Sequence, residues 1–294
     1  MSNIYEIVTD KIVKQLDKGI VPWNKPWTCS TGAVSHYNGR PYSLLNQIML
    51  MDEDDSITDL KGREYITFTQ IKAEGGSIRK GEKSKMVVFW KMYDKETNEL
   101  DANGNKVVKR VATLRYYNVW EVGQCEGIKR KYEAVERHHD PIAEAEAIVS
   151  GYFGRETCTL EVVESDRAFY SPILDLVHVP QPSQYEDIAE YYSTLFHEMT
   201  HSTWHKSRCD RELTGMAAFG GKEYSREELV AEMGAAFLMN TSGIDSKKAF
   251  RNSVGYIQGW SRKLRDEPRM FVTAAGKAEK AVEYIINGKE DVCM

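Results

Sequence analysis

Several features that would assign this chain to a specialised class are missing from its 294 residues. No run of about eighteen apolar residues occurs, so we expect no membrane-spanning helix. The N-terminus lacks a basic segment followed by an apolar one, so we expect no secretory signal. The five cysteines are scattered and form no C-x-x-C pair, which indicates reduced thiols in a cytoplasmic protein. Internal repeats and low-complexity segments are also missing.

A strong net charge is missing as well. The chain has a net charge of −5. Residues 1–127 contain 18 basic and 17 acidic residues, and the remainder contains 21 basic and 27 acidic residues. Because the first half is nearly neutral, nucleic-acid binding has to be argued from local clusters of cations. The hydrophobic content of 41% and the charged content of 28% are ordinary for a globular protein. The length favours two domains.

The hydrophobic periodicity predicts an α+β fold, with a small antiparallel sheet in the first domain. That domain, residues 1–127, is expected to contain helices over 3–19, 43–52 and 66–76 and strands over 86–93 and 107–120, the strands being joined through Asn103-Gly104. Residues 128–139 are predicted to be a linker. The second domain, residues 140–294, is expected to contain a helix from Asp140, strands over 159–163, 167–170 and 173–179, and helices starting near 184, 225, 247 and 273.

Residues 195–201, with the sequence LFHEMTH, contain an H-E-x-x-H motif. In a helix, His197 and His201 share one face a turn apart and can bind one zinc ion. Glu198 lies beside them as the candidate catalytic base. His205 would lie roughly 12 Å along the helix axis from His197 at 1.5 Å per residue, too far to share the ion.

A catalytic zinc site needs a third protein ligand. The metzincin pattern H-E-x-x-H-x-x-G-x-x-H is missing, so we look to the helix beginning near Ser225. Glu228 is the predicted ligand, and Glu232 is predicted to accept a hydrogen bond from the free nitrogen of a ligating histidine. Two alternatives stay open: Ser225 and Glu228 form a capping box without a metal, or Glu232 is the ligand and Glu228 the cap. Glu227 is expected to face solvent.

Two further features of the hydrolytic site are predicted from position alone. The segment 174–178 is the candidate edge strand that would hold an extended peptide. Tyr224 or Arg226, beside the ligand helix, is the candidate donor to a developing oxyanion.

Taken in order, the motifs of this chain resemble the ArdC-type antirestriction proteins carried by conjugative plasmids and related mobile elements. The matching motifs are VTDKI at 8–12, VPWNKPW at 21–27, GRPY at 39–42, IRKGEK at 78–83, VVFWK at 87–91, YNVW at 117–120, HEMTH at 197–201, HKSR at 205–208 and EELVAE at 227–232. The resemblance covers nearly the whole chain. It implies an N-terminal single-stranded-DNA-binding domain, a C-terminal zincin-like metallopeptidase domain and protection of incoming DNA from host restriction. The chain departs from the expected WTGH run at 202–205, where it reads STWH.

Aromatic and basic residues of the first domain agree with that implication, since single strands are bound by stacking on bases and by cations along the phosphates. The aromatic candidates are Trp23, Trp27, Tyr42, Trp90, Tyr117 and Trp120. The cationic candidates are Lys25, Arg40, Arg79, Lys80, Lys83, Lys85 and Lys91. A single aromatic residue is more often part of a core, so the joint pattern carries the prediction.

The sequence therefore predicts an antirestriction protein that binds single-stranded DNA and has a zinc metallopeptidase-like site. Manganese or another divalent ion suits the same ligands. One alternative is a protein that coats single strands passively and keeps a structural or vestigial metal site. Another is a protease that acts on DNA-bound proteins, with a restriction enzyme as the possible substrate class. No membrane partner is expected.

Overall fold

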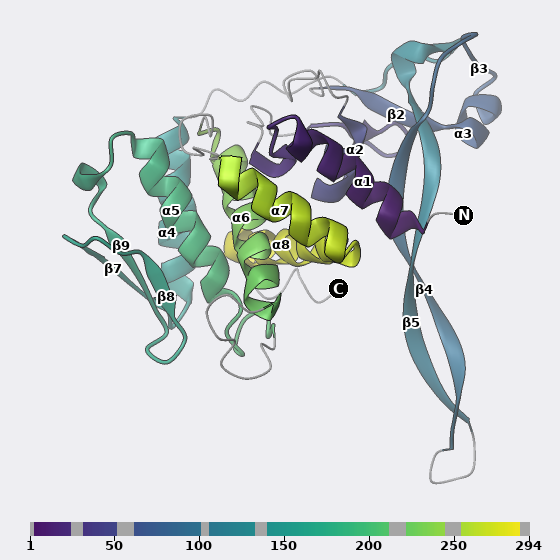
Figure 1. Ribbon diagram of the computed structural model, residues 1–294. Helices are drawn as coiled ribbons and strands as arrows, with labels where there is room; N and C mark the ends of the chain where they lie inside the picture. Colours follow the sequence, from purple (N-terminus) through teal and green to yellow (C-terminus); the bar gives the residue numbers. More distant parts are fainter. Residues whose placement is uncertain are drawn as a thin grey trace.

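The structure, a computed structural model, describes residues 3–24, 32–51, 62–100, 106–132, 140–211, 222–244 and 254–288. It contains a helical body, a sheet with a long projecting ribbon, and a small three-stranded sheet on the opposite side of the body (Figure 1). This arrangement confirms the expected α+β class. Within these ranges no helix is both long and apolar enough to cross a membrane.

Helices from the two ends of the chain pack together in the helical body. They are α1 (Ile4–Asp17) and α2 (Leu44–Leu50) from the first half and α7 (Val254–Asp266) and α8 (Arg269–Asn287) from the second. A capping box between Asn3 and Glu6 begins α1, whose apolar stripe includes the fully buried Ile12. One apolar core therefore contains residues from both halves of the sequence.

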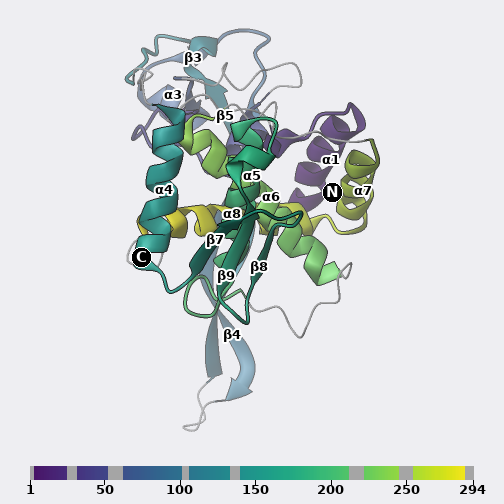
Figure 2. The ribbon, with the colours of Figure 1, turned by 90° about the vertical axis from the view of Figure 1, so that its left-hand side faces the viewer.

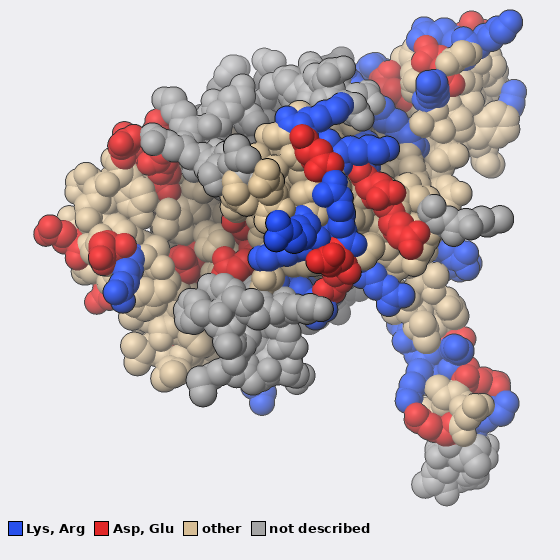
Figure 3. Space-filling model, viewed as in Figure 1, with Lys and Arg blue, Asp and Glu red and all other residues tan. Residues whose placement is uncertain are grey.

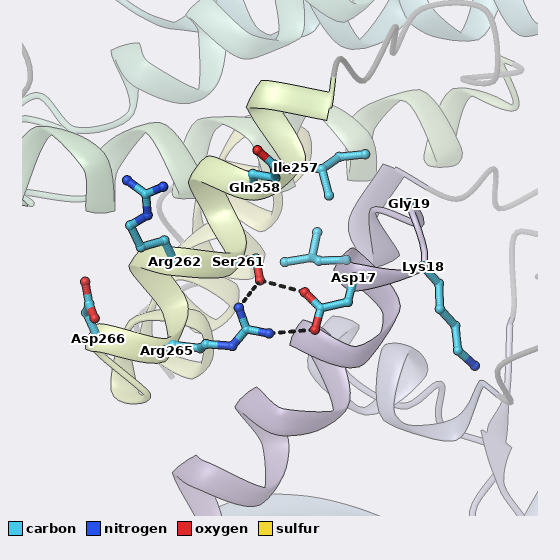
Figure 4. Close-up of a pocket in the computed structure, with 10 residues that line it drawn as sticks. Asp17, Lys18, Gly19, Ile257, Gln258, Ser261, Arg262, Arg265 and Asp266 are labelled. Carbon is cyan, nitrogen blue, oxygen red and sulfur yellow. Dashed lines mark hydrogen bonds and ion pairs between the residues drawn. The ribbon is translucent and has the colours of Figure 1, made fainter.

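A polar contact at the rim of this core joins α1 to α7. Arg265 donates to Asp17 and to Ser261, at 2.6 and 2.8 Å, and Ser261 donates to Asp17 at 2.9 Å. These residues line a surface concavity of about 670 Å³ between the two helices (Figure 4). The two halves of the chain are thus connected by side chains as well as by the intervening segment.

The first sheet has the strand order β1-β2-β5-β4. Its strands are β1 (Val34–Ser35), β2 (Glu64–Thr67), β4 (Lys85–Leu100) and β5 (Lys106–Glu121). The antiparallel pair β4–β5 was predicted, but both strands are longer than expected and form a ribbon that projects from the body (Figure 1). The helix expected over 66–76 is α3 (Phe68–Ala73), because residues up to Thr67 belong to β2. Asn103 and Gly104 lie outside the described residues.

Residues 125–132 follow the ribbon and contact segments of the first half of the chain. After η3 (Val122–Gln124), β6 (Cys125–Glu126) pairs with β3 (Ser77–Ile78). The backbone N–H groups of Lys131 and Tyr132 then donate to the buried Glu64, at 2.8 and 2.6 Å. Burying Glu64 is tolerable because His36 contacts the same carboxylate at 2.6 Å. The predicted linker, 128–139, thus includes residues hydrogen-bonded to β2 of the first sheet. Residues 133–139 lie outside the described residues.

The second half forms a sheet and a pair of long helices. Its elements are α4 (Pro141–Arg155), β7 (Thr159–Val163), β8 (Phe169–Ser171), β9 (Leu176–Pro180), η4 (Pro182–Gln184), α5 (Ile188–Ser202) and α6 (Lys222–Ser242). Asp140 caps α4 as expected. The strand order is β7-β9-β8, so the expectation that 174–178 forms the sheet edge was wrong: β9 is central and β8 is an antiparallel edge strand (Figure 2).

Candidate metal centre

Helix α5 presents the H-E-x-x-H motif toward α6. Asp187 caps its N-terminus, and the four-residue spacing places His197 and His201 on one face. Their rings lie 4.7 Å apart between centroids, with 3.1 Å between the two Nε2 atoms. Glu198, between them in sequence, is only 8% exposed.

Helix α6 brings Glu228 to the same point. Its carboxylate oxygens lie 3.6 Å from Nε2 of His197 and 3.4 Å from Nε2 of His201. Tetrahedral bonds of 2.0–2.1 Å would separate ligand atoms by about 3.3 Å, so the three side chains fit one divalent ion. In the part of the chain that the structure describes, this is the one group of three potential ligand residues close enough to hold a metal.

The close approach of α6 to α5 depends on small residues. A Cβ added at Gly234 would meet Thr200 of α5 at 2.5 Å, and Ala231 and Ala235 are buried beside it. The helix begins at Lys222, so Ser225 lies inside it and cannot be the N-cap of a capping box. The local explanation of Glu228 as a capping residue is therefore wrong.

The electrostatics of the cluster favour a cation. Burial alone would lower the pKa of His201, but interactions with Glu227 and Glu228 raise it to about 10. Burial alone would raise the pKa of Glu228, yet its contacts with His197 and His201 hold that pKa well below the usual range. Carboxylates surround the two imidazoles, so a positive charge is stabilised there, whether carried by a proton or by a metal ion.

The carboxylate behind His201 is Glu227, which was expected to face solvent. It is 4% exposed, and its Oε1 lies 3.7 Å from Nδ1 of His201. Arg211 holds the same carboxylate with two hydrogen bonds, of 2.5 and 3.1 Å. Sequence reasoning missed both residues, because Arg211 lies sixteen positions before Glu227 and no local pattern connects them.

Glu232 has a different environment from the one predicted for it. Among the described side chains no ion pair within 4.0 Å joins Glu232 to His197 or His201. Burial and the neighbouring Glu228 carboxylate raise its pKa, against the opposing effects of His197 and Tyr256. It therefore lies near the cluster without contacting a ring nitrogen.

The remaining candidates of the hydrolytic site lie elsewhere. His205 follows the end of α5, and its Nδ1 pairs with the hydroxyl of Ser207 at 2.9 Å. Arg226 is exposed and forms an ion pair with Glu267 at 2.7 Å, so it does not face the cluster. The side chain of Tyr224 lies outside the described part of the molecule.

Two family profiles match separate parts of the chain. A profile for the N-terminal domain of the anti-restriction factor ArdC matches residues 2–120, and a profile for zincin-like metallopeptidases matches residues 148–277. The metal-free crystal structure of ArdC from plasmid R388 is 32% identical, with a TM-score of 0.70 and coverage of 97% of both chains. The chain belongs to the ArdC antirestriction family. The Mn(II)-bound R388 structure is 29% identical over 99% of both chains, with a TM-score of 0.73.

Part of a larger protein is also similar to this ArdC-family chain. A DNA primase TraC of Escherichia coli is 30% identical over 96% of the chain. The chain spans only 27% of that relative's length, so the similarity concerns one segment of TraC.

Several predicted DNA contacts of this ArdC-family member are structural instead. Trp23 is fully buried and packs edge-on against Trp260, so its prediction as a base-stacking residue was wrong. Tyr42 is half-buried against Tyr65, and Lys85 donates to the carbonyl of Leu50. Lys25 and Trp27 lie outside the described residues. The exposed candidates are Arg40, Arg79, Lys80, Lys83, Trp90, Lys91 and Tyr117, while Trp120 is half-buried.

The projecting ribbon carries exposed aromatic side chains on both faces, with Trp90 and Tyr116 on one and Phe89, Tyr93 and Tyr117 on the other. Phe89 and Tyr117 lie 5.4 Å apart between ring centroids, and Tyr93 follows Phe89 on the same face. Lys91 and Arg115 share this face and are exposed, and no ion pair within 4.0 Å joins either to a described carboxylate. Figure 3 shows cations along the ribbon, with carboxylates nearer its tip. Phe89, Tyr93 and Arg115 were not among the predicted contacts.

Proposed function

We propose that this chain is an antirestriction protein that binds single-stranded DNA and hydrolyses peptide bonds at a divalent-metal centre. The observation that carries the proposal is the convergence of His197, His201 and Glu228 from two helices, beside the buried Glu198. Such a ligand set leaves one coordination position for a substrate, as in hydrolytic zinc sites. Zinc and manganese both suit these ligands.

The roles of the residues follow from their positions. When bound, a divalent ion supplies Lewis-acid polarisation of a substrate carbonyl. The side chains of His197, His201 and Glu228 would hold it. Glu198 would take a proton from the attacking water and return it to the leaving amine. Because β8 is the antiparallel edge strand and lies next to α5, an extended peptide would pair with β8.

The DNA site is proposed on the ribbon face defined by Phe89, Tyr93 and Tyr117 with Lys91 and Arg115. Its rings are 39–42% exposed, which leaves them open to stacking on bases. The cations between them can follow the phosphates of a strand laid along the ribbon. The basic loop with Lys80 and Lys83 leads directly into β4 and would extend the same path.

The metal half of the proposal is tested with Glu198→Ala beside Glu228→Ala. Metal content is measured by elemental analysis, and protection is measured as transfer of a plasmid into restricting and non-restricting recipients. We expect Glu198→Ala to keep its metal and to lose protection, and Glu228→Ala to lose both. If Glu198→Ala keeps its metal and still protects the incoming DNA, hydrolysis is not the basis of protection and passive strand coating explains it.

The DNA half is tested by fluorescence anisotropy with single- and double-stranded oligonucleotides over a range of salt concentrations. The double variant Phe89→Ala/Tyr117→Ala should weaken single-strand binding at least fivefold, since stacking contributes about 1–3 kcal/mol per base. Lys91→Ala should instead reduce the salt slope by about 0.7. Tyr116→Ala, on the opposite ribbon face, is the matched control. Equal affinity of the wild type for both oligonucleotides would contradict the stacking argument.

A further inference from the structure

Two ion pairs lie at the C-terminal end of α5, and the second of them is buried. In the first, Arg208 holds Asp175 and donates from Nε to the carbonyl of Ser202 at 2.9 Å. In the second, Arg211 holds Glu227 and donates to the carbonyl of Thr200 at 3.0 Å. Each places a guanidinium at the negative end of the helix dipole, which accounts for a cation there. The buried carboxylate of Glu227, 4% exposed, needs a further explanation, because burying an ion pair is often no better than burying apolar residues.

The two pairs differ in what the carboxylate reaches. Oε1 of Glu227, which accepts from Arg211 at 2.5 Å, also lies 3.7 Å from Nδ1 of His201. The other nitrogen of that ring, Nε2, faces Glu228 at 3.4 Å and His197 at 3.1 Å. One carboxylate therefore lies near each nitrogen of the His201 ring. A carboxylate paired with an arginine accepts hydrogen bonds and donates none, so a proton on Nδ1 suits the side of the ring that faces Glu227.

Arg211 fixes this carboxylate relative to the turn that bears His201. Besides the Thr200 carbonyl, its guanidinium donates to the hydroxyl of Thr203 at 2.7 Å. Thr200 and Thr203 lie one and two residues from His201, so movement of Glu227 against the ring would break contacts to the same turn.

We propose that Arg211 and Glu227 are a positioning pair that holds the proton of His201 on Nδ1 and directs its Nε2 toward His197 and Glu228. The inference rests on the proposed metal centre, and neither member of the pair is a metal ligand in it. The role predicted for Glu232 thus belongs to Glu227. Carboxylates in such positions raise metal affinity by 10–100-fold in other sites.

The test replaces the pair by apolar residues of similar size, Arg211→Met/Glu227→Leu, because removing one charge alone would leave the other buried and unpaired. Glu227→Gln serves as a second variant that preserves the shape. Asp175→Asn, in the Arg208 pair, is the matched control, since it weakens an ion pair at the same helix end that does not touch His201. Zn²⁺ affinity is measured by competition with a chromophoric chelator, and folding by urea unfolding.

We expect the double variant and Glu227→Gln to bind Zn²⁺ 10–100-fold more weakly while Asp175→Asn stays within about twofold of the wild type. Wild-type affinity in the folded double variant overturns the proposal. If the wild type itself binds no Zn²⁺, the metal centre of the proposed function is wrong, and crystal structures of the metal-free proteins then decide the positioning role. A His201 ring that turns away from Glu228 in the double variant supports it, and an unmoved ring overturns it.

Discussion

The contact between α5 and α6 at Gly234 leads to the most direct prediction about this fold. A Cβ at Gly234 would lie 2.5 Å from both Cγ2 and Oγ1 of Thr200, whereas a Cβ at Gly276, inside α8, meets nothing within 4 Å. Both Gly→Ala changes gain up to about 1 kcal/mol of helix propensity. Only Gly234→Ala also overpacks a buried contact, which costs about 1–3 kcal/mol. Gly234→Ala should therefore be about 1–3 kcal/mol less stable than Gly276→Ala.

The same overlap should weaken metal binding. Ordinary van der Waals contact begins near 3.4 Å, so α6 must move by roughly 1 Å to relieve a 2.5 Å approach. Metal ligand distances tolerate only about 0.2 Å, and Glu228 lies less than two turns from Gly234 on the same helix. We expect at least tenfold weaker Zn²⁺ binding by Gly234→Ala.

Urea unfolding and chelator competition measure the two effects on the same protein samples. Thr200→Ala combined with Gly234→Ala removes the two atoms at 2.5 Å, leaving only Cβ of residue 200 at 3.0 Å, and should restore most of both losses. Equal unfolding free energies for Gly234→Ala and Gly276→Ala, or unchanged Zn²⁺ affinity in Gly234→Ala, would refute the reasoning. In that case the helix spacing would not depend on this glycine.

Three further predictions concern stability. Trp23→Ala should lower the unfolding free energy by about 3–5 kcal/mol, against less than about 1 kcal/mol for the exposed Trp90→Ala, as measured by urea unfolding. Asp175 has a depressed pKa in the folded protein, because hydrogen bonds from Tyr170 and Arg208 outweigh the effect of burial. The stability that this carboxylate contributes is therefore fully present above the unfolded pKa near 3.9. It is lost as the pH falls through the lower folded value. The difference in unfolding free energy between the wild type and Asp175→Asn should thus be constant above about pH 5 and should shrink below pH 4. A difference that grows on acidification would contradict the depressed pKa. Glu64→Gln should speed proteolytic cleavage near residues 131–132, because Glu64 accepts hydrogen bonds from the backbone N–H groups of both residues. Unchanged cleavage would show that another contact holds this segment.

Local sequence patterns predicted most elements and the centre of the site. Asp140 and Pro141 predicted the start of α4, and β-branched and aromatic residues on either side of Asn103-Gly104 predicted the β4–β5 pair, because capping and hairpin signals act over a few residues. The strand order β7-β9-β8 was not predictable in this way, since pairing depends on contacts between distant segments. For the same reason Trp23 resembled a binding residue beside two prolines, although it fills the core between helices from the far end of the chain.

By itself the sequence determined that His197 and His201 share a face of one helix, with Glu198 beside them, because a spacing of four residues fixes that relation within a single turn. Only the tertiary structure decided which acidic residues of α6 meet those imidazoles. Glu227, Glu228 and Glu232 lie within two turns of one helix, and their roles depend on how that helix is rotated and how closely it packs. The Gly234–Thr200 contact sets the spacing, and Arg211, from a separate loop, fixes Glu227 behind His201.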